Sequence, residues 1–460
     1  MAQHETRREF LKLAGSFSAG LMLGATGCTA PSGFNGESKP AVDVDAAGLS
    51  APPMDIVRIG MIGVGDRGSQ HIDKLIHINH AHIVAIADPF IKAARRARRA
   101  CVDAGFTAPD LYTKGDYDYR RMLERDDIDA VWVSTPWRWH ATQGIDAMLA
   151  GKHAFIEVPM ALTLAELWRL VDTCEKTGRH CMMMENVNYG REELLALNLC
   201  RKGVLGELLH GEAAYIHDLR YQMNDVEHGT GSWRTAYHAK ENANLYPTHG
   251  LGPIAQYMNI DRTDDRFDTI VSYSSPALGR ERYARLNLPE GHPHRRLKYI
   301  CGDINTSIIK TQVGRTIMVQ WDTTTPRPYT RHNLIQGTQG VFAGFPTRLA
   351  LEGRDNYHQW TTGRDMQKFY DEYEHPLWLR MGEQAQRVGG HGGMDFIMNS
   401  RIIECLRGGE PMDQNVYEGA SWSAVRPLSA WSVAHHGRPA SFPDFTRSRW
   451  PNILPLGIIQ

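Results

Sequence analysis

Hydrophobic positions in the first half of the chain change repeatedly between strand-like and helical spacing. Residues 56–59 have the short apolar pattern of a strand, and the apolar positions 72, 75 and 76 that follow have helical spacing. Further strands are expected at 82–87, 130–134, 153–158 and 181–184, and helices at 92–99, at 141–150 and after Thr163, where Thr-Leu-Ala-Glu fits a capping box. This alternation predicts a doubly wound parallel sheet.

After Glu185 the pattern becomes rich in strands. A helix is expected around 191–202, and two more near 393–407 and 416–436. Strands are expected at 212–216, 269–273, 307–313, 316–321 and 332–336. The chain is therefore expected to combine an α/β and an α+β part. An N-terminal domain at 51–187 would carry the doubly wound parallel sheet, and a C-terminal substrate-binding domain at 188–460 a largely antiparallel open sheet.

The first 50 residues have the features of an export signal and a linker. Arg7-Arg8 precedes Phe10-Leu11-Lys12 as in a twin-arginine signal, and the apolar stretch 13–25 is too short to span a bilayer. Cys28 ends a sequence similar to a lipoprotein cleavage box, which makes it a candidate lipid anchor. These features predict export by the twin-arginine route to the periplasm or the cell surface.

Composition and charge are those of an ordinary globular protein. Of the 460 residues, 42% are hydrophobic and 22% charged, and the net charge of −1 gives no bulk attraction to nucleic acid or to an anionic membrane. The basic run Lys92–Arg99 is interpreted as a solvated helix face. The seven cysteines form no Cys-x-x-Cys pair and no zinc-ligand spacing. Neither a metal site nor a nucleic-acid partner is expected.

The strand at 56–59 leads into a glycine-rich turn. Gly63, Gly65 and Gly68 fit Gly-x-Gly-x-x-Gly, a pattern that gives a tight turn, a close approach of pyrophosphate to the backbone and close packing of helix on strand. Asp88 follows the next expected strand, 20 positions after Gly68. A carboxylate at this spacing accepts hydrogen bonds from an adenosine ribose and repels a 2′-phosphate. The segment therefore predicts a Rossmann domain that binds NAD in preference to NADP.

Two further strand ends supply candidate cofactor contacts, because nucleotides lie at the carboxyl edge of an open parallel sheet. The loop after the strand at 130–134 contains Trp137, Arg138, Trp139 and His140. Trp137 and His140 are expected to border the cofactor, whereas Trp139 fits cofactor contact and core packing equally well. Glu157 ends a later strand, where it holds the nicotinamide ribose or caps a neighbouring helix.

Four of these features occur together in one known superfamily. The glycine turn, the acid after the second strand, the Thr-Pro-x-x-x-His loop at 135–140 and Glu157-Val158-Pro159 resemble the glucose–fructose oxidoreductase and inositol dehydrogenase superfamily. Its dehydrogenases usually have Glu-Lys-Pro, with the lysine near the reacting hydroxyl. This chain has Val158 at that place, which speaks against plain dehydrogenation of a sugar.

Motifs after residue 183 point to one family within this superfamily. They are Met-Glu-Asn-Val-Asn-Tyr at 184–189, His-Asp-Leu-Arg at 217–220, Ser-Trp-Arg-Thr at 232–235, Leu-Tyr-Pro-Thr-His-Gly at 245–250, Arg-Pro-Tyr at 327–329 and Gly-Gly-His-Gly-Gly-Met-Asp at 389–395. Together they resemble glycoside hydrolase family 109, whose members are NAD-dependent α-N-acetylgalactosaminidases. The resemblance implies bound NAD and a glycan substrate with terminal α-linked N-acetylgalactosamine, as in mucin-type glycans.

The reaction that this resemblance implies is a hydrolysis without net redox change. NAD⁺ takes a hydride from C3 of the sugar, the C2 proton becomes acidic and is removed, and the group at C1 leaves by elimination. Water then adds at C1, and the hydride returns to C3. Such a cycle favours tightly held NAD, because loss of NADH would leave an oxidised sugar behind.

Chemistry and resemblance together assign roles to individual residues. His249, with Tyr246 beside it, is expected to take the C3 hydroxyl proton, because histidine titrates near working pH. Tyr189 is the candidate base at C2, and His391 in its glycine-rich loop is the candidate acid and base at C1. The resemblance adds sugar contacts at Tyr215, Arg220, Arg234, Pro247, Thr248 and Tyr329, and NAD contacts at Asp66, Arg67, Val158 and Asn186.

Two alternative functions stay open at this point. One is a sugar oxidoreductase with net turnover of NAD, and the other is a non-catalytic protein that binds sugar or NAD. The choice of N-acetylgalactosamine rests on the resemblance alone. A homo-oligomer is also expected.

Overall fold

The computed structural model describes residues 45–354 and 358–459 of the chain. The twin-arginine pattern at Arg7-Arg8, the apolar stretch 13–25 and the candidate lipid anchor Cys28 lie outside the described residues. In the described part, no helix combines the length and the apolarity that crossing a bilayer requires. The elements described below all belong to one compact unit.

The described residues of the first half form a six-stranded sheet. Its order is β3-β2-β1-β4-β5-β6, and all neighbouring strands are parallel. The strands are β1 (Val57–Ile62), β2 (Ala81–Ala87), β3 (Asp110–Tyr112), β4 (Ala130–Val133), β5 (His153–Ile156) and β6 (Cys181–Met183). This order is that of a dinucleotide-binding Rossmann sheet, so the predicted fold is confirmed. The sequence did not indicate β3, because three residues are too few to show a period.

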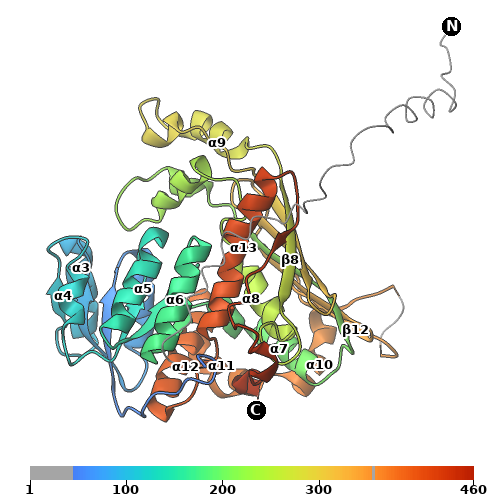
Figure 1. Ribbon diagram of the computed structural model, residues 1–460, viewed down its shortest axis with the longest axis horizontal. Helices are drawn as coiled ribbons and strands as arrows, with labels where there is room; N and C mark the ends of the chain where they lie inside the picture. Colours follow the sequence, from blue (N-terminus) through green and yellow to red (C-terminus); the bar gives the residue numbers. More distant parts are fainter. Residues whose placement is uncertain (1–44, 355–357, 460) are drawn as a thin grey trace, which may run out of the picture. The chain divides into compact units, whose positions relative to one another are not determined.

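Helices connect these strands and lie beside the sheet (Figure 1). They are α2 (Asp66–Leu75), α3 (Ile91–Asp103), α4 (Tyr119–Leu123), α5 (His140–Leu149) and α6 (Leu164–Thr177). The predicted capping box of α6 is confirmed. The Glu166 amide donates to the Thr163 hydroxyl at 3.2 Å, and the Thr163 amide donates to the Glu166 carboxylate at 3.0 Å. Both amides would otherwise lack a partner at the helix start.

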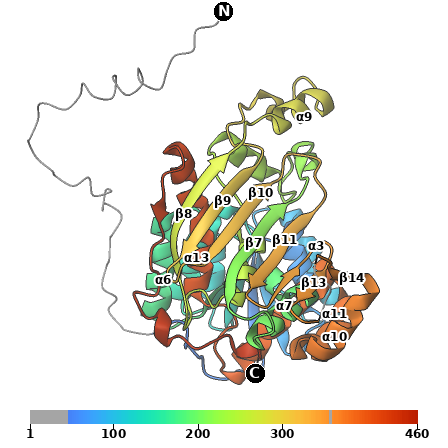
Figure 2. The same cartoon turned by 90° about the vertical axis from the view of Figure 1, so that its right-hand side faces the viewer.

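A second sheet, with nine strands among the described residues, occupies the later part of the chain (Figure 2). Its order is β14-β13-β12-β11-β7-β10-β9-β8-β15. The strands are β7 (Leu208–Ile216), β8 (Phe267–Ser274), β9 (Asn305–Thr311), β10 (Thr316–Asp322), β11 (Thr330–Gly337), β12 (Gly340–Ala343), β13 (Arg348–Leu351), β14 (Thr361–Thr362) and β15 (Ala440–Ser441). Apart from the parallel pair β7–β10, neighbours are antiparallel, which confirms the predicted largely antiparallel sheet.

The later helices pack around and between the two sheets. They are α7 (Arg191–Arg201), α8 (Thr248–Tyr257), α9 (Gly279–Asn287), α10 (Gln367–Tyr373), α11 (Pro376–Val388), α12 (Met394–Gly408) and α13 (Val416–Ala434). In Figure 1, α13 runs between α6 and β8, and it contacts both. α12 contacts α2 and β1, so a helix from the predicted second domain packs on the first sheet. The domain boundaries themselves stay a prediction.

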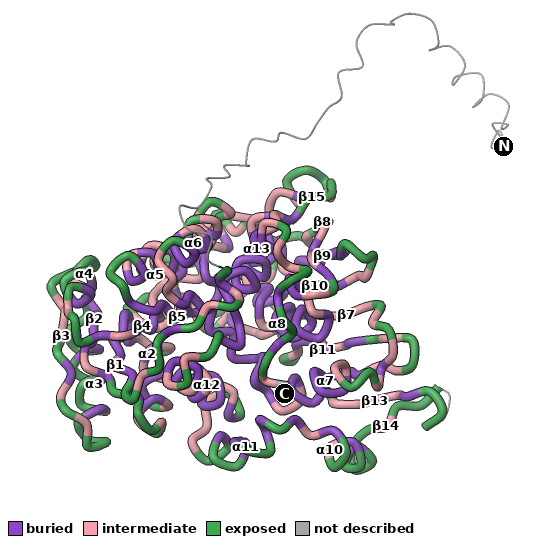
Figure 3. The backbone as a smooth tube through the Cα atoms, turned by 60° about the horizontal axis from the view of Figure 1, so that its bottom comes forward, coloured by how far each residue is buried: buried purple, intermediate pink, exposed green. Residues whose placement is uncertain are grey.

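Strand β4 shows how the parallel sheet is buried on both faces. Trp132 packs in the same cluster as Phe396 of α12, whereas Val131 packs in the cluster that contains Leu167 of α6. The buried Trp132 Nε1 donates to Asn399 Oδ1 of α12 at 2.8 Å. Figure 3 shows the buried backbone, in purple, through β4 and β5. Helix α12 is thus fixed against the strands whose ends carry the candidate cofactor contacts.

We expect Gly68→Ala to lower the free energy of unfolding by about 2 kcal/mol, as overpacking of a close contact does. A Cβ at this position would lie 2.0 Å from the carbonyl oxygen of Gly63. Urea denaturation measures the change. Gly291→Ala is the matched control, because a Cβ there meets no described atom within 4 Å. Equal stability of the two variants would contradict the packing role of the third glycine.

Candidate active site

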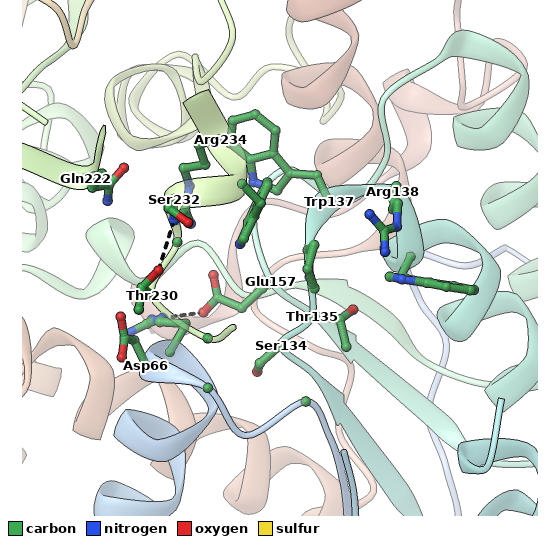
Figure 4. A pocket seen from close by; sticks show the side chains of 18 of the residues that line it. Asp66, Ser134, Thr135, Trp137, Arg138, Glu157, Gln222, Thr230, Ser232 and Arg234 are labelled. Carbon is green, nitrogen blue, oxygen red and sulfur yellow. Dashed lines mark hydrogen bonds and ion pairs between the residues drawn. The ribbon is translucent and has the colours of Figure 1, made fainter. Parts of the chain in front are cut away.

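A cavity of about 850 Å³ lies where the carboxyl ends of the parallel strands meet residues that follow this sheet in the chain. Such a volume lies within the range of small-molecule and cofactor sites. The strand ends contribute Gly63, Asp88, Ser134 and Glu157, and the other wall contributes Tyr215, Trp233, Arg234, Tyr246 and His249. Figure 4 shows Ser134, Thr135 and Trp137 facing Thr230, Ser232 and Arg234, with Glu157 between the two groups.

The glycine turn at the end of β1 has the geometry that a dinucleotide requires. Gly63 has a φ of +85°, and a Cβ there would lie 2.9 Å from the carbonyl oxygen of Ser134, so only glycine fits. Asp88, at the end of β2, accepts hydrogen bonds from the amides of Val64 at 2.9 Å and Phe90 at 2.8 Å. These bonds fix its carboxylate beside the cavity, where an adenosine ribose is expected.

Several polar atoms of the cavity lack partners within the described protein. The Ser134 hydroxyl, Trp137 Nε1 and Asn186 Oδ1 are buried without a hydrogen bond to any described residue, and all three residues line the cavity. Buried polar groups are seldom left in this state without a ligand or water. Together with the glycine turn and Asp88, these atoms fit bound NAD.

Arg67, in the first turn of α2, connects two buried carboxylates. Its Nε donates to Glu157 Oε1 at 2.5 Å, and its Nη1 and Nη2 donate to the two carboxylate oxygens of Asp395 at 2.9 and 2.8 Å. Burial opposes ionisation of both acids, but the charge of Arg67, together with His71 at Glu157 and His391 at Asp395, outweighs burial and holds the pKa of both carboxyls well below their ordinary values. The end of β5, α2 and α12 are therefore joined at one edge of the cavity.

His249 is held by a buried carboxylate at the start of α8. Its Nδ1 lies 2.6 Å from Glu185 Oε1, and its Nε2 lies 3.3 Å from the Tyr246 hydroxyl. Glu185 is fully buried just after β6, whereas His249 and Tyr246 line the cavity. Burial raises the pKa of Tyr246 well above its ordinary value, so this side chain stays a neutral phenol. The arrangement provides a potential base whose ring is oriented by a carboxylate.

His391 forms a second pair with a buried carboxylate. Its Nδ1 lies 2.7 Å from Asp395 Oδ2, while the side-chain Nδ2 of Asn186 donates to Asp395 Oδ1 at 2.8 Å. The His391 side chain is 53% exposed and that of His249 only 16% exposed. The cavity therefore has one histidine that meets solvent and one that is largely shielded from it.

Aromatic side chains form much of the remaining wall. The ring centroids of Tyr215 and Tyr246 are 4.8 Å apart, and the Tyr215 hydroxyl lies 3.1 Å from Nδ1 of His217. The Arg234 guanidinium lies 5.6 Å from the ring centroid of Trp137. Flat apolar faces with polar tips suit a ligand that presents both C–H faces and hydroxyl groups.

Comparison with known protein families covers both halves of the described chain. Residues 57–185 match the family described as oxidoreductase family, NAD-binding Rossmann fold, and residues 189–452 match glycosyl hydrolase 109, C-terminal domain. The chain belongs to glycosyl hydrolase family 109. With its NAD-binding domain, it is an NAD-dependent glycoside hydrolase, as the sequence resemblance predicted.

Family 109 relatives match along nearly the whole chain. A glycosyl hydrolase family 109 protein from Shewanella baltica (strain OS185) is 57% identical over 456 residues, and an alpha-N-acetylgalactosaminidase from Shewanella oneidensis is 55% identical over 456 residues. Each alignment covers 98% of both chains.

Solved structures of sugar dehydrogenases show the same fold. Levoglucosan dehydrogenase in complex with NADH and L-sorbose aligns with a TM-score of 0.65 at 20% identity, over 85% of this chain and 100% of the other. A myo-inositol dehydrogenase from Lactobacillus casei in complex with NAD(H) and myo-inositol aligns with a TM-score of 0.56 at 19% identity, over 85% and 99%.

The cavity of this family 109 member brings together most of the predicted residues. Those that line it are Gly63, Gly65, Asp66, Arg67, Asp88, Trp137, Arg138, Trp139, His140, Glu157, Val158, Asn186, Tyr215, Arg234, Tyr246, His249 and His391. His140 also connects two segments of the cavity wall. Its Nδ1 lies 2.7 Å from the carbonyl oxygen of Pro159, and its Nε2 lies 2.7 Å from that of Thr135. Within the described ranges, no group of three or more His, Cys, Asp or Glu side chains is arranged to hold a metal ion.

Tyr189 does not reach the cavity, which contradicts its predicted role as the base at C2. Its side chain is 1% exposed, and its hydroxyl donates to Asp413 Oδ2 at 3.1 Å. Burial raises the pKa of this phenol well above its ordinary value, which further disfavours a role as a base. Tyr189 instead packs at the end of η2 (Asn186–Tyr189), a 3₁₀ turn that positions Asn186.

Four predicted sugar contacts, Arg220, Pro247, Thr248 and Tyr329, are not among the residues that line the cavity. Arg220 forms an ion pair with Asp218 at 2.7 Å and does not line the cavity. Pro247 and Thr248 begin α8 and so present His249, and Thr248 is fully buried. The ring of Tyr329 packs edge-on against that of His217, with centroids 5.0 Å apart.

Two carboxylates that bind the cavity histidines, Glu185 and Asp395, were not predicted as site residues. Glu185 follows β6 as Glu157 follows β5, so the same strand-end argument would have found it. Asp395 stands four positions after His391, and the two side chains form an ion pair in the structure. Both positions could be located in the sequence. Their roles depend on residues far away in the chain, since Glu185 contacts His249 and Asp395 contacts Arg67.

We expect Arg67→Met to lower the free energy of unfolding of the NAD-free protein by about 3–5 kcal/mol near neutral pH, because it leaves buried carboxylates without their shared cation. Arg67 depresses the pKa of Glu157 and Asp395, so its stabilising effect is present above their unfolded pKa values and is lost as the pH falls through the folded ones. In urea denaturation, the gap between wild type and variant should therefore shrink on acidification. A gap that does not change with pH would contradict this account.

Proposed function

We propose that this enzyme removes terminal α-linked N-acetylgalactosamine from glycans by oxidation, elimination, addition and reduction, without net redox change. The observation that carries the proposal is a pair of carboxylate-bound histidines, His249 on Glu185 and His391 on Asp395, that line one cavity with the NAD-binding turn. The 55% identity to an alpha-N-acetylgalactosaminidase from Shewanella oneidensis supports the choice of sugar.

His249 and Tyr246 serve the chemistry at C3. Bound NAD⁺ supplies a hydride acceptor for this carbon and later the donor that restores it. His249 takes the C3 hydroxyl proton, and Glu185 orients its ring and stabilises the charge that the ring gains. Tyr246, as a neutral phenol, donates a hydrogen bond to the C3 oxygen and stabilises the negative charge that develops there when the C2 proton leaves.

Removal of the C2 proton requires a group other than Tyr189. Tyr215 and His217 lie on the cavity wall, with the Tyr215 hydroxyl 3.1 Å from His217 Nδ1. Burial lowers the pKa of His217, so its imidazole is neutral near pH 7 and able to accept a proton. We assign the base at C2 to this pair.

His391 serves the chemistry at C1. It protonates the oxygen of the leaving group and then takes a proton from the water that adds at C1. Its exposed ring gives a departing glycan and an entering water access to the same side chain. The neighbouring Gly390 and Gly392 have positive φ values of 86° and 71°, a conformation that glycine adopts without strain.

The alternative of a sugar oxidoreductase with net turnover of NAD has less support. Val158 is buried and lines the cavity. It brings no amine to the place where related dehydrogenases usually have a lysine. The wall is equipped for proton transfer by histidines instead, which favours the hydrolytic cycle.

We further propose that the enzyme is exported after folding with NAD, by the twin-arginine route, to the periplasm or the cell surface. Arg7-Arg8 and the apolar stretch 13–25 support this route, and Cys28 is the candidate lipid anchor. Mucin-type glycans are the proposed natural substrates, because they carry α-linked N-acetylgalactosamine. The homo-oligomer stays a prediction.

A set of aryl glycosides that differ only in the sugar tests the proposed function directly. The enzyme is incubated with each in deuterated water, without added NAD, and the released sugar is examined by NMR. We expect aglycone release from the α-N-acetylgalactosaminide and deuterium at C2 of the product. Release without deuterium at C2 would contradict the elimination step, and a requirement for stoichiometric added NAD would favour the oxidoreductase.

We expect Glu185→Gln, His249→Ala and His391→Ala each to lower kcat for aglycone release by about 10²–10⁴-fold, the range for loss of a general acid–base group or of the carboxylate that orients it. The NAD content of the purified variants should match that of wild type. His77→Ala, an exposed histidine outside the cavity, is the control. Full activity of all three variants would remove these residues from the mechanism.

A further inference from the structure

One wall of the cavity comes from a segment that no motif singled out. Residues 226–231 follow η3 (Arg220–Met223) and precede η4 (Ser232–Ala239), and all six line the cavity. We call this segment the roof loop. It follows the parallel sheet in the chain by more than 40 residues, yet it contacts the glycine turn and the end of β2 in that sheet. Figure 4 shows Thr230 of this loop beside Asp66 of α2.

Gly229 places the roof loop directly on the glycine turn. The Asp66 amide, at the start of α2, donates to the Gly229 carbonyl oxygen at 3.0 Å. A Cβ on Gly65 would lie 3.0 Å from the Gly229 Cα, and Gly229 has a φ of +82°. Two backbones that approach so closely require glycine on both sides. The contact lies at the turn where a pyrophosphate is expected.

His228 places the same loop at the adenosine end of the site. Its ring stacks on Phe90 with centroids 4.1 Å apart and planes inclined by 2°. Its Nε2 lies 3.4 Å from Oδ1 of Asp88, the carboxylate that is expected to hold the ribose. A histidine from outside the parallel sheet thus contacts Asp88 and Phe90, two of the three residues between β2 and α3.

The roof loop bounds the cavity and does not fill it. With the loop in contact with the adenosine end and with the pyrophosphate turn of the dinucleotide site, a cavity of about 850 Å³ remains. We infer that the roof loop closes the NAD site and slows release of the bound dinucleotide, with His228 at the adenosine end and Gly229 at the pyrophosphate turn. The binding role depends on the NAD site alone, whereas its benefit during turnover rests on the proposed function, in which release of NADH would leave an oxidised sugar.

Release of NADH in the absence of sugar tests the inference. The full-length protein is loaded with NADH and mixed with excess NAD⁺, and the loss of protein-bound NADH fluorescence gives the release rate. We expect His228→Ala to release NADH about tenfold faster than wild type, because one stacked ring and its polar contact are lost. His435→Ala is the matched control: it also removes a histidine stacked on an aromatic ring, that of Trp431 at 4.2 Å, but outside the cavity.

Gly229→Ala provides a second variant, since a Cβ there meets Gly65 at 3.3 Å in a backbone conformation that disfavours alanine. We expect faster release here as well. Unchanged release in both variants would overturn the inference. Slower release or tighter binding would also overturn it, because the loop would then compete with the dinucleotide. No sugar is present, so neither result bears on the glycosidase; a wild-type protein that holds NADH but frees no aglycone would refute only the proposed function.

Discussion

The ion pairs of Arg67 with Glu157 and Asp395 are the interaction on which the architecture of the site depends. A buried carboxylate is costly unless it is paired and hydrogen-bonded, and two of them close together would repel each other. One guanidinium satisfies both, with its Nε on Glu157 and both Nη atoms on Asp395. Because Glu157 directly follows β5 and Asp395 lies in the first turn of α12, this cation fixes α12 on the edge of the parallel sheet.

The same pairing links the cofactor site to the chemistry at C1. Asp395 accepts hydrogen bonds from Arg67 and Asn186, both expected NAD contacts, and it also holds Nδ1 of His391. His249 depends on a separate carboxylate, Glu185, that follows β6. The two histidines are therefore held by independent acids, and one of these acids is shared with the NAD site. A sheet used for binding dinucleotides thereby also positions the groups for glycoside cleavage.

Local sequence patterns predicted the parallel sheet well, because its strands are short apolar runs that end in chemically distinct residues. The spacing from Gly68 to Asp88 and the position of Glu157 after its strand placed the cofactor side of the cavity. Helix α8 was not predicted, since Gly250, Gly252 and Pro253 interrupt its helical pattern. Tyr189 was misassigned because its direction is set by Asp413, 224 residues away. The contact of α12 with the first sheet is likewise a long-range event that no local period reveals.

The central claim is that bound NAD takes part in the cleavage of a glycosidic bond. The most direct test is the rate of aglycone release by protein that has been freed of all dinucleotide and shown by circular dichroism to remain folded. The account predicts that this protein is inactive on the α-N-acetylgalactosaminide and that NAD⁺ in amounts equal to the enzyme restores its activity. Undiminished cleavage by the dinucleotide-free protein would contradict it.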